Sequence, residues 1–184
     1  RTWIAVAMCV AALVQGTGKP PLPRVAADTE LGEIVLEIDT IRAPLTAANF
    51  LKYVDAGLYD GGRFHRSVRT HPDNQPRNES KIDVIQAGAN PSRAMEYLMP
   101  IAHEPTSKTG LTHGDGVVSM ARAQVNTARD QFFVCIGDQP ELDFGGKRNA
   151  DGQGFAAFGR VVAGMEIVRK IHGSPSSGQT LTPA

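Results

Sequence analysis

Cysteine is scarce in this sequence, with two residues among 184. Cys9 lies in an apolar N-terminal run, which leaves Cys135 without a partner in the remainder of the chain. No internal disulfide is therefore expected. Cys135 sits within the strand-like run 131–136, where a packed structural thiol is a better interpretation than a nucleophile.

Net charge is also absent, because 19 basic and 19 acidic side chains cancel. This balance gives no reason to expect a nucleic acid or an acidic membrane surface as a partner. With 41% hydrophobic residues, a chain of 184 residues can form one domain with a sizeable core. We therefore expect a single domain that recognises its partner by shape.

The N-terminal apolar run is too short for a helix that crosses a bilayer, which takes about 20 residues. It covers residues 3–14 without a charge and is followed by small residues near Val14 and Gly16, a pattern typical of a secretory signal. We predict a signal-like segment at 1–16, a linker at 17–30 and a domain at 31–184. The protein is then periplasmic or secreted, without stable membrane insertion once the signal is removed. The alternatives are a buried N-terminal helix and a membrane tether formed by an uncleaved signal.

Motifs for metals, nucleotides and a nucleophilic serine are missing as well. The one His/acid grouping comprises His103, Glu104, His113 and Asp115, and its spacing matches no zinc pattern. Residues 114–116 lack the third glycine of a dinucleotide fingerprint, and no Walker sequence occurs. The serines of 173–178 have the wrong spacing for a nucleophile elbow. We therefore expect no metal and no cofactor.

What the chain does contain is a series of short alternating segments bounded by turn residues. Strands are predicted at 33–38, 63–68, 83–87, 116–121, 131–136 and 155–162. Two helices are predicted, one from Pro44 to just before Gly57 and one between Gly164 and Gly173. Residues 69–81 are polar and indicate a long surface loop. The fold class is therefore mainly β, a barrel or sandwich with helices at its ends.

Side chains two positions apart on a strand share a face, which groups several candidate site residues in pairs. These pairs are Val84 with Gln86, Ala121 with Ala123, and Gln131 with Phe133. Arg66 adds a permanent charge within the alternating segment 63–68. Pattern alone does not separate a binding site from ordinary packing at these positions. Phe132, of opposite parity to Phe133, is expected in the core.

Six segments resemble, in order, the signature blocks of the cyclophilins, a family of peptidyl-prolyl cis-trans isomerases. They are FHR at 64–66, VIQAG at 84–88, VSMARA at 118–123, NT at 126–127, QFFVC at 131–135 and FGRV at 158–161. The resemblance extends from about Leu31 to about Ile171. It implies a closed eight-stranded antiparallel barrel capped by two helices, with no cofactor. Because the sequence stops about where the family's closing strand begins, the presence of that last strand stays open.

The resemblance also implies a role for each candidate residue. Arg66 would donate a hydrogen bond to the prolyl nitrogen, and Gln86 would hold the substrate carbonyl or orient Arg66. The implied substrate-binding residues are Val84, Ala121, Arg122, Ala123, Gln131, Phe133, Leu142 and Phe155. Among them, the backbone around Arg122 would pair with the substrate chain. The implied partners are proline-containing peptides or unfolded protein chains, bound by a monomer that assists folding.

Three features depart from the family pattern. Asp83 stands where most members have a phenylalanine of the pocket wall, and Glu141 stands where many have a tryptophan. The connection from Arg66 to Val84 is longer than usual, so its loop is expected to roof the groove and narrow substrate choice. Two alternatives to catalysis stay open. One is a weakly active peptide-binding module or chaperone, and the other is a purely structural barrel in which Arg66 is paired internally.

Overall fold

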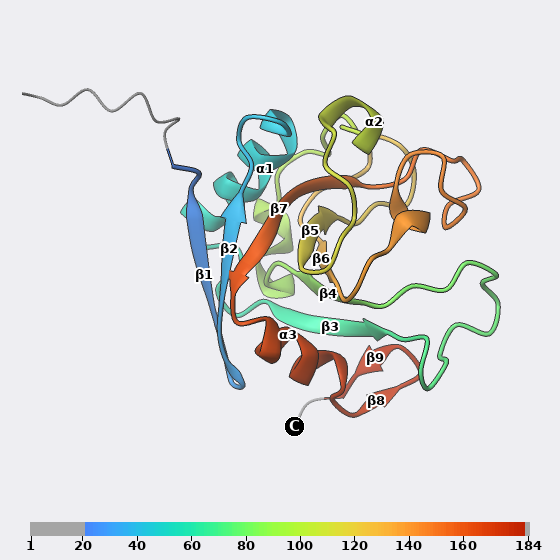
Figure 1. Ribbon diagram of the computed structural model, residues 1–184. Coiled ribbons are helices and arrows are strands. Elements are labelled where there is room, and N and C mark those ends of the chain that lie inside the picture. Colours follow the sequence, from blue (N-terminus) through green and yellow to red (C-terminus); the bar gives the residue numbers. More distant parts are fainter. Residues whose placement is uncertain (1–20, 183–184) are drawn as a thin grey trace, which may run out of the picture.

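The computed structural model describes residues 21–182 (Figure 1). The predicted signal segment at 1–16 lies outside this range. Strand β1 (Arg24–Thr29) occupies most of the described part of the predicted linker, so the domain begins before Leu31, contrary to the prediction. The strand forms because its backbone pairs with β2 (Gly32–Ile38) along its whole length. As an edge strand without fully buried side chains, β1 has no strong hydrophobic alternation in its sequence.

Nine strands form one antiparallel sheet in the order β1-β2-β7-β5-β6-β4-β3-β9-β8. The remaining strands are β3 (Arg63–Val68), β4 (Val84–Gly88), β5 (Val117–Met120), β6 (Phe132–Cys135), β7 (Ala156–Ala163), β8 (Ser176–Ser177) and β9 (Thr180–Leu181). Each of the predicted strands lies close to an observed one, which confirms the mainly β, antiparallel fold class. The hairpin β8–β9 was not predicted, because two-residue strands are too short to show alternation.

The sheet has two edges within residues 21–182, β1 and β8, and no strand pairing joins them. The described chain thus forms an open nine-stranded sheet, and the expected closed eight-stranded barrel is not observed in this range. The short hairpin at the end of the described chain gives a physical reason. Strand β9 meets β3 at one register pair, Arg66 with Thr180, and β8 adds beyond it. The hairpin therefore extends the sheet past β3 without reaching β1.

Two of the helices, α1 (Pro44–Asp55) and α3 (Met165–His172), match the predicted ones. In Figure 1, α1 lies above the sheet and α3 below it. Three short helices were not predicted, since one or two turns carry little periodicity. They are α2 (Thr106–Thr109) and the 3₁₀ helices Pro91–Glu96 and Pro140–Leu142. No helix within residues 21–182 is both long and apolar enough to cross a bilayer.

The main core lies between the sheet and the two longer helices. It contains the inward-facing residues of β2 that the alternation predicted, Ile34, Leu36 and Ile38. Phe132 of β6 also belongs to this core and meets Phe50 of α1 edge to face, with ring centroids 5.4 Å apart. The expectation that Phe132 is a core residue is therefore confirmed.

A second apolar cluster, called here the outer cluster, forms on the opposite face of the central strands. Its buried members are Val68, Ile82, Val84, Phe133, Cys135 and Leu142, with Ala121 and Phe155 packed against them. Phe132 and Phe133 fall into different clusters because neighbouring residues of a strand point to opposite faces. Cys135 is fully buried, and burial raises the pKa of its thiol, which supports a structural role.

Candidate active site

Arg66, Gln86 and Phe133 lie in one row across three neighbouring strands. Arg66 of β3 is the register partner of Gln86 of β4, and Gln86 is the partner of Phe133 of β6. Residues directly opposite one another in an antiparallel pair point to the same face of the sheet. The fold thus brings together both predicted catalytic residues and one predicted pocket residue, next to the outer cluster.

A chain of side-chain hydrogen bonds runs along this row. Arg66 donates from Nη1 to Oε1 of Gln86 over 3.0 Å, and Gln86 donates from Nε2 to Oε1 of Gln131 over 2.5 Å. Gln86 therefore lies between the guanidinium and Gln131, and both ends of its amide are fixed. Burial lowers the pKa of Arg66 below its ordinary value, but a guanidinium stays protonated at any physiological pH.

Gln179 is a neighbour of Arg66 that the sequence analysis missed. Its Oε1 accepts from Nε of Arg66 over 2.8 Å and from Nη2 over 2.5 Å. Its own Nε2 donates to the main-chain oxygen of Asn74 over 2.9 Å. Gln179 sits in the turn between β8 and β9. No sequence signal identified it, because a polar residue in a glycine-containing turn is ordinary.

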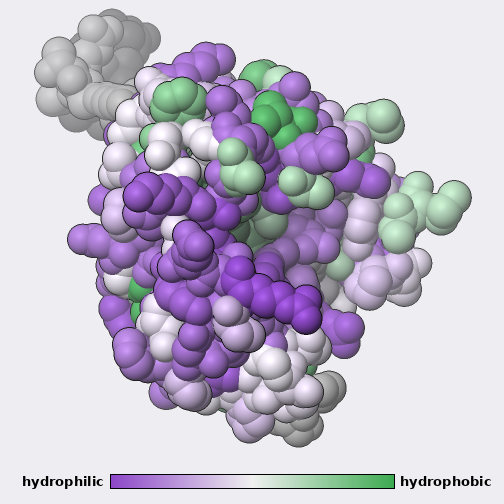
Figure 2. All heavy atoms as spheres, turned by 90° about the vertical axis from the view of Figure 1, so that its right-hand side faces the viewer, coloured by the Kyte–Doolittle hydropathy of each residue, from purple (hydrophilic) through white to green (hydrophobic). Residues whose placement is uncertain are grey.

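Five residues predicted for the proline pocket come together in the outer cluster. Val84, Phe133 and Leu142 are buried in it, and Ala121 and Phe155 line it while remaining partly exposed. The rings of Phe133 and Phe155 meet edge to face with centroids 5.3 Å apart. Figure 2 shows the face of the molecule on the right-hand side of Figure 1, which is hollowed near its centre, with apolar atoms at depth and hydrophilic residues around them.

Asp83 and Glu141 both turn their carboxylates toward loops. Asp83 accepts from the main-chain nitrogen and the hydroxyl of Thr70, over 2.9 and 2.6 Å. Glu141 accepts from the main-chain nitrogen of Lys147 over 2.7 Å. The apolar wall is completed instead by Ile82, the residue before Asp83. The two departures from the family pattern therefore change the loops beside the pocket and leave its apolar cluster intact.

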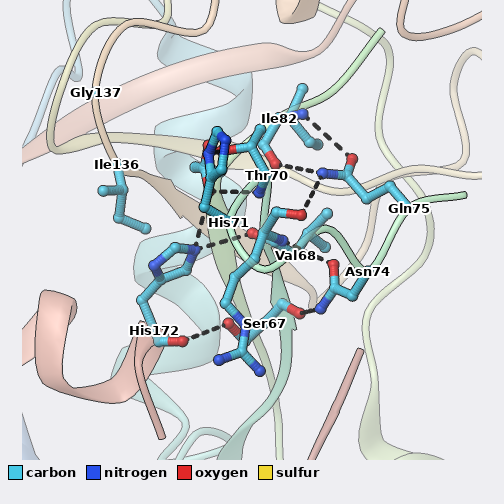
Figure 3. A network of polar contacts seen from close by, with 12 residues as sticks. Ser67, Val68, Thr70, His71, Asn74, Gln75, Ile82, Ile136, Gly137 and His172 are labelled. Carbon is cyan, nitrogen blue, oxygen red and sulfur yellow. Dashed lines mark hydrogen bonds and ion pairs between the residues drawn. The ribbon is translucent and has the colours of Figure 1, made fainter. Parts of the chain in front are cut away.

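The long loop 69–82 is tied to the end of β3, and α3 holds the same end of β3 (Figure 3). Asn74 donates from Nδ2 to the oxygen of Ser67, and Gln75 donates from Nε2 to the oxygen of Ile82, over 2.9 and 2.8 Å. His172, the last residue of α3, accepts from the Ser67 hydroxyl at its main-chain oxygen over 2.8 Å. The loop thus approaches the row of Arg66, Gln86 and Phe133 from the side of β3, where Asn74 meets Gln179.

Arg122 has its side chain fully engaged within the chain. It donates from Nε to the oxygen of Gly154 over 2.8 Å, forms an ion pair with Asp151, and lies 5.3 Å from the ring centroid of Phe155. The predicted strand 116–121 corresponds to β5, but β5 ends at Met120, so the predicted shared strand face of Ala121 and Ala123 is not observed.

The backbone near Arg122 has unequal hydrogen bonding. The main-chain nitrogen of Ala121 donates to the oxygen of Gln131 over 2.9 Å, and that of Ala123 donates to the Thr127 hydroxyl over 3.2 Å. Within residues 21–182, the main-chain nitrogen and oxygen of Arg122 have no partner. The resemblance implies that this backbone pairs with a substrate chain.

The residues first considered for metal binding lie in separate interactions. The Glu104 carboxylate accepts from the nitrogen and hydroxyl of Thr46 over 2.8 and 2.7 Å. Asp115 is paired with Arg169 at 2.7 Å. Among the described residues, no group of three or more histidine, cysteine or acidic side chains is placed to hold a metal ion.

Comparisons with known proteins agree with this geometry. Residues 24–183 match the family model described as cyclophilin type peptidyl-prolyl cis-trans isomerase/CLD. The peptidyl-prolyl cis-trans isomerase of Streptomyces antibioticus is 35% identical over 148 residues, which cover 79% of this chain and 81% of that protein. Peptidyl-prolyl cis-trans isomerase B of Escherichia coli K12 is 33% identical over 148 residues, again covering 79% and 81%.

Solved structures show the same likeness of fold. A cyclophilin type peptidyl-prolyl cis-trans isomerase of Cryptosporidium parvum superposes with a TM-score of 0.65 at 21% identity, covering 86% of this chain and 90% of that one. Its structure in the presence of the dipeptide Ala-Pro superposes with a TM-score of 0.64. With the family model matched over most of the chain, this protein belongs to the cyclophilin-type peptidyl-prolyl cis-trans isomerases.

Proposed function

We propose that this protein catalyses the cis-trans isomerisation of X-Pro bonds in peptides and unfolded protein chains, and so assists protein folding. The observation that carries this proposal is the row of Arg66, Gln86 and Phe133, which places a guanidinium beside an apolar cluster. The curated relatives are named for this activity. A related structure was determined in the presence of Ala-Pro, which supports proline-containing peptides as the ligand class.

Catalysis by this site requires stabilisation of a twisted amide. Rotation about an X-Pro bond crosses a barrier of about 18–20 kcal/mol, because amide resonance is lost in the perpendicular state. The prolyl nitrogen then becomes a better hydrogen-bond acceptor, and a donor from Arg66 stabilises the twisted state over either planar one. The aromatic pocket around Phe133 holds the pyrrolidine ring while the preceding residue rotates. No covalent bond breaks, so the site needs neither nucleophile nor acid.

The structural-barrel alternative predicted that Arg66 is paired internally, and Arg66 does donate three hydrogen bonds within the chain. The two acceptor atoms are the amide oxygens of Gln86 and Gln179, and within residues 21–182 no carboxylate forms an ion pair with Arg66. A guanidinium has five N–H groups, so two remain for a substrate. This pairing therefore favours an oriented catalytic group over a structural ion pair.

The proposal is tested by isomer-specific proteolysis of a proline-containing peptide, with the wild-type chain and the variant Arg66→Ala. We expect kcat/KM to fall by about 100-fold or more in the variant, as for removal of one preorganised donor. Thermal unfolding of both proteins controls for folding. Absence of activity in the wild type would sink the proposal, and retained peptide binding without turnover would favour the binding-module alternative.

We also propose that the protein is exported and acts as a monomer. The support for export is the apolar run at 3–14, followed by small residues, which lies outside the described part of the structure. Expression of the full sequence in a bacterium, followed by fractionation and mass measurement, tests the localisation. A shortened periplasmic form is expected, whereas an uncleaved form in the membrane fraction supports the tether. Size-exclusion chromatography tests the oligomeric state.

A further inference from the structure

The catalytic guanidinium of Arg66 is held by a residue from outside the family's signature segments. We propose that Gln179, in the turn of the hairpin β8–β9, is a positioning residue that fixes the orientation of Arg66 for catalysis. This inference rests on the proposed isomerase function and adds the hairpin to the active site. It is carried by the two hydrogen bonds that converge on one oxygen atom of Gln179.

The geometry of a guanidinium explains why these bonds set its orientation. The group is planar, and its five N–H donors form a rigid fork. Oε1 of Gln179 accepts from Nε and Nη2, which share one edge of the plane, while Gln86 accepts from Nη1. Two acceptors on different sides thus fix both the plane and the direction of the group. The two N–H groups that stay free, one on each terminal nitrogen, then have a defined position.

Gln179 is itself fixed by the surrounding backbone. Its Nε2 donates to the oxygen of Asn74, and its main-chain oxygen accepts from the nitrogen of Ser67 over 2.8 Å. The side chain of Asn74 donates to the oxygen of Gly178 over 3.1 Å, which holds the turn against loop 69–82. The amide of Gln179 therefore has little freedom to rotate, and its oxygen points to Arg66. An acceptor fixed in this way orients Arg66 before the substrate binds.

Loss of the Gln179 acceptor should therefore affect turnover more than substrate binding. Gln179 lies on the guanidinium side of the row, while the apolar pocket is built by the outer cluster. Loss of the acceptor should leave proline binding largely intact and let Arg66 sample orientations that do not reach the prolyl nitrogen. Misplacement of a catalytic group lowers the rate of the chemical step more than it lowers the affinity for substrate.

The test replaces Gln179 by methionine, which has a similar length and no amide. Exchange NMR on a tetrapeptide containing Ala-Pro gives the catalysed rate and the dissociation constant separately. We expect kcat to fall about 10-fold, with a dissociation constant within about 2-fold of wild type. The Nε–H signal of Arg66, assigned by its loss in Arg66→Ala, should shift in Gln179→Met because it loses its acceptor.

Thr182→Ala is the matched control for the hairpin. Thr182 donates its hydroxyl to the oxygen of Pro175 over 3.0 Å and has no contact with Arg66, so this variant loosens the hairpin without changing the guanidinium. We expect its kcat to equal that of wild type. An unchanged or increased kcat in Gln179→Met, or an equal loss in both variants, would overturn the positioning role. An inactive wild type would instead contradict the isomerase function, so the two failures are distinguishable.

Discussion

The imidazole of His113 lies stacked against the ring of Phe133, with centroids 6.0 Å apart and 15° between the planes. His113 Nδ1 is 2.7 Å from Asp143 Oδ1, and Nε2 is 2.9 Å from Ser119 Oγ. These three residue types also form hydrolytic triads, but Ser119 is 0% exposed and cannot attack a bound substrate. The arrangement instead supports Phe133, an aromatic residue of the predicted proline pocket.

Replacement of His113 by leucine should therefore weaken both the fold and the pocket. The change leaves the Ser119 hydroxyl and the Asp143 carboxylate without their imidazole partner, and we expect a loss of about 2–4 kcal/mol of unfolding free energy. Urea denaturation at neutral pH measures it. His103→Leu is the control, because within residues 21–182 the side chain of this partly exposed histidine has one hydrogen bond, 3.0 Å to the oxygen of Gln153. Equal losses in the two variants would contradict the special role of His113.

Replacement of Gln86 by leucine should reduce catalysis while the fold persists. Leucine keeps approximate volume but removes the acceptor for Arg66 and the donor for Gln131. We expect kcat/KM to fall by roughly 10- to 100-fold, since one charge-assisted hydrogen bond that orients the catalytic donor is lost. The proteolysis assay measures this loss, and thermal unfolding checks integrity. Activity within 2-fold of wild type would show that Arg66 needs no orientation from this strand.

The central part of the fold was predictable because its strands have one face toward the main core. Alternation placed β2, β3, β4, β5, β6 and β7 near their observed bounds. The edges were not predictable: β1 and the hairpin β8–β9 are held by backbone pairing and have few buried side chains. Backbone pairing leaves little signal in side-chain pattern. This is also why the open edges of the sheet were missed.

The candidate site shows the same contrast between local pattern and long-range contact. Arg66, Gln86, Val84 and Phe133 were found through strand parity and resemblance, and the structure places them in adjacent strands. Gln179 is separated from Arg66 by 113 positions and lies in a turn, so no local signal linked the two residues. Asp83 was expected to alter the pocket wall. Its carboxylate instead accepts hydrogen bonds from Thr70, and this interaction depends on the conformation of loop 69–82.

We expect Arg148, which lies between Leu142 and β7, to hold loop 69–82 in place. Its Nη1 donates to Oε1 of Gln75 and to the oxygen of Ser80, both over 2.8 Å. Burial, and then the charge of Arg66, lower the pKa of the Arg148 guanidinium below its ordinary value. Arg148→Ala should speed hydrogen exchange at the Ile82 amide, which donates to Gln75 over 3.2 Å.

The control for this prediction is Lys147→Ala. Lys147 is the exposed neighbour of Arg148, and within residues 21–182 its side chain has no ion pair or hydrogen bond. Hydrogen exchange followed by NMR should show faster exchange at Ile82 by about 5-fold or more in Arg148→Ala and no change in Lys147→Ala, as expected for loss of one hydrogen-bonded anchor. Equal exchange rates in both variants would mean that the loop is held without Arg148.

The ion pair of Arg122 with Asp151 should make the pocket sensitive to acid. The Arg122 side chain, followed by the main-chain N–H of Gln153, lowers the pKa of Asp151 to about 2 from its ordinary value of 3.8. A carboxylate with a lowered pKa stabilises the folded state above its unfolded pKa, and this contribution is lost as pH falls through the folded pKa. The stabilisation should therefore be complete above about pH 4 and decline between about pH 4 and pH 2.

A comparison of wild type with Asp151→Asn checks this dependence. The variant should have a lower urea midpoint than wild type at pH 6, and the difference should shrink as pH approaches 2, where the Asp151 carboxylate becomes protonated. A carboxyl-carbon NMR titration of Asp151 gives its pKa directly. Because Arg122 also packs over Phe155, the variant should bind proline-containing peptides more weakly at pH 6. A midpoint difference that stays constant from pH 6 to pH 2 would rule out the ion pair as its source.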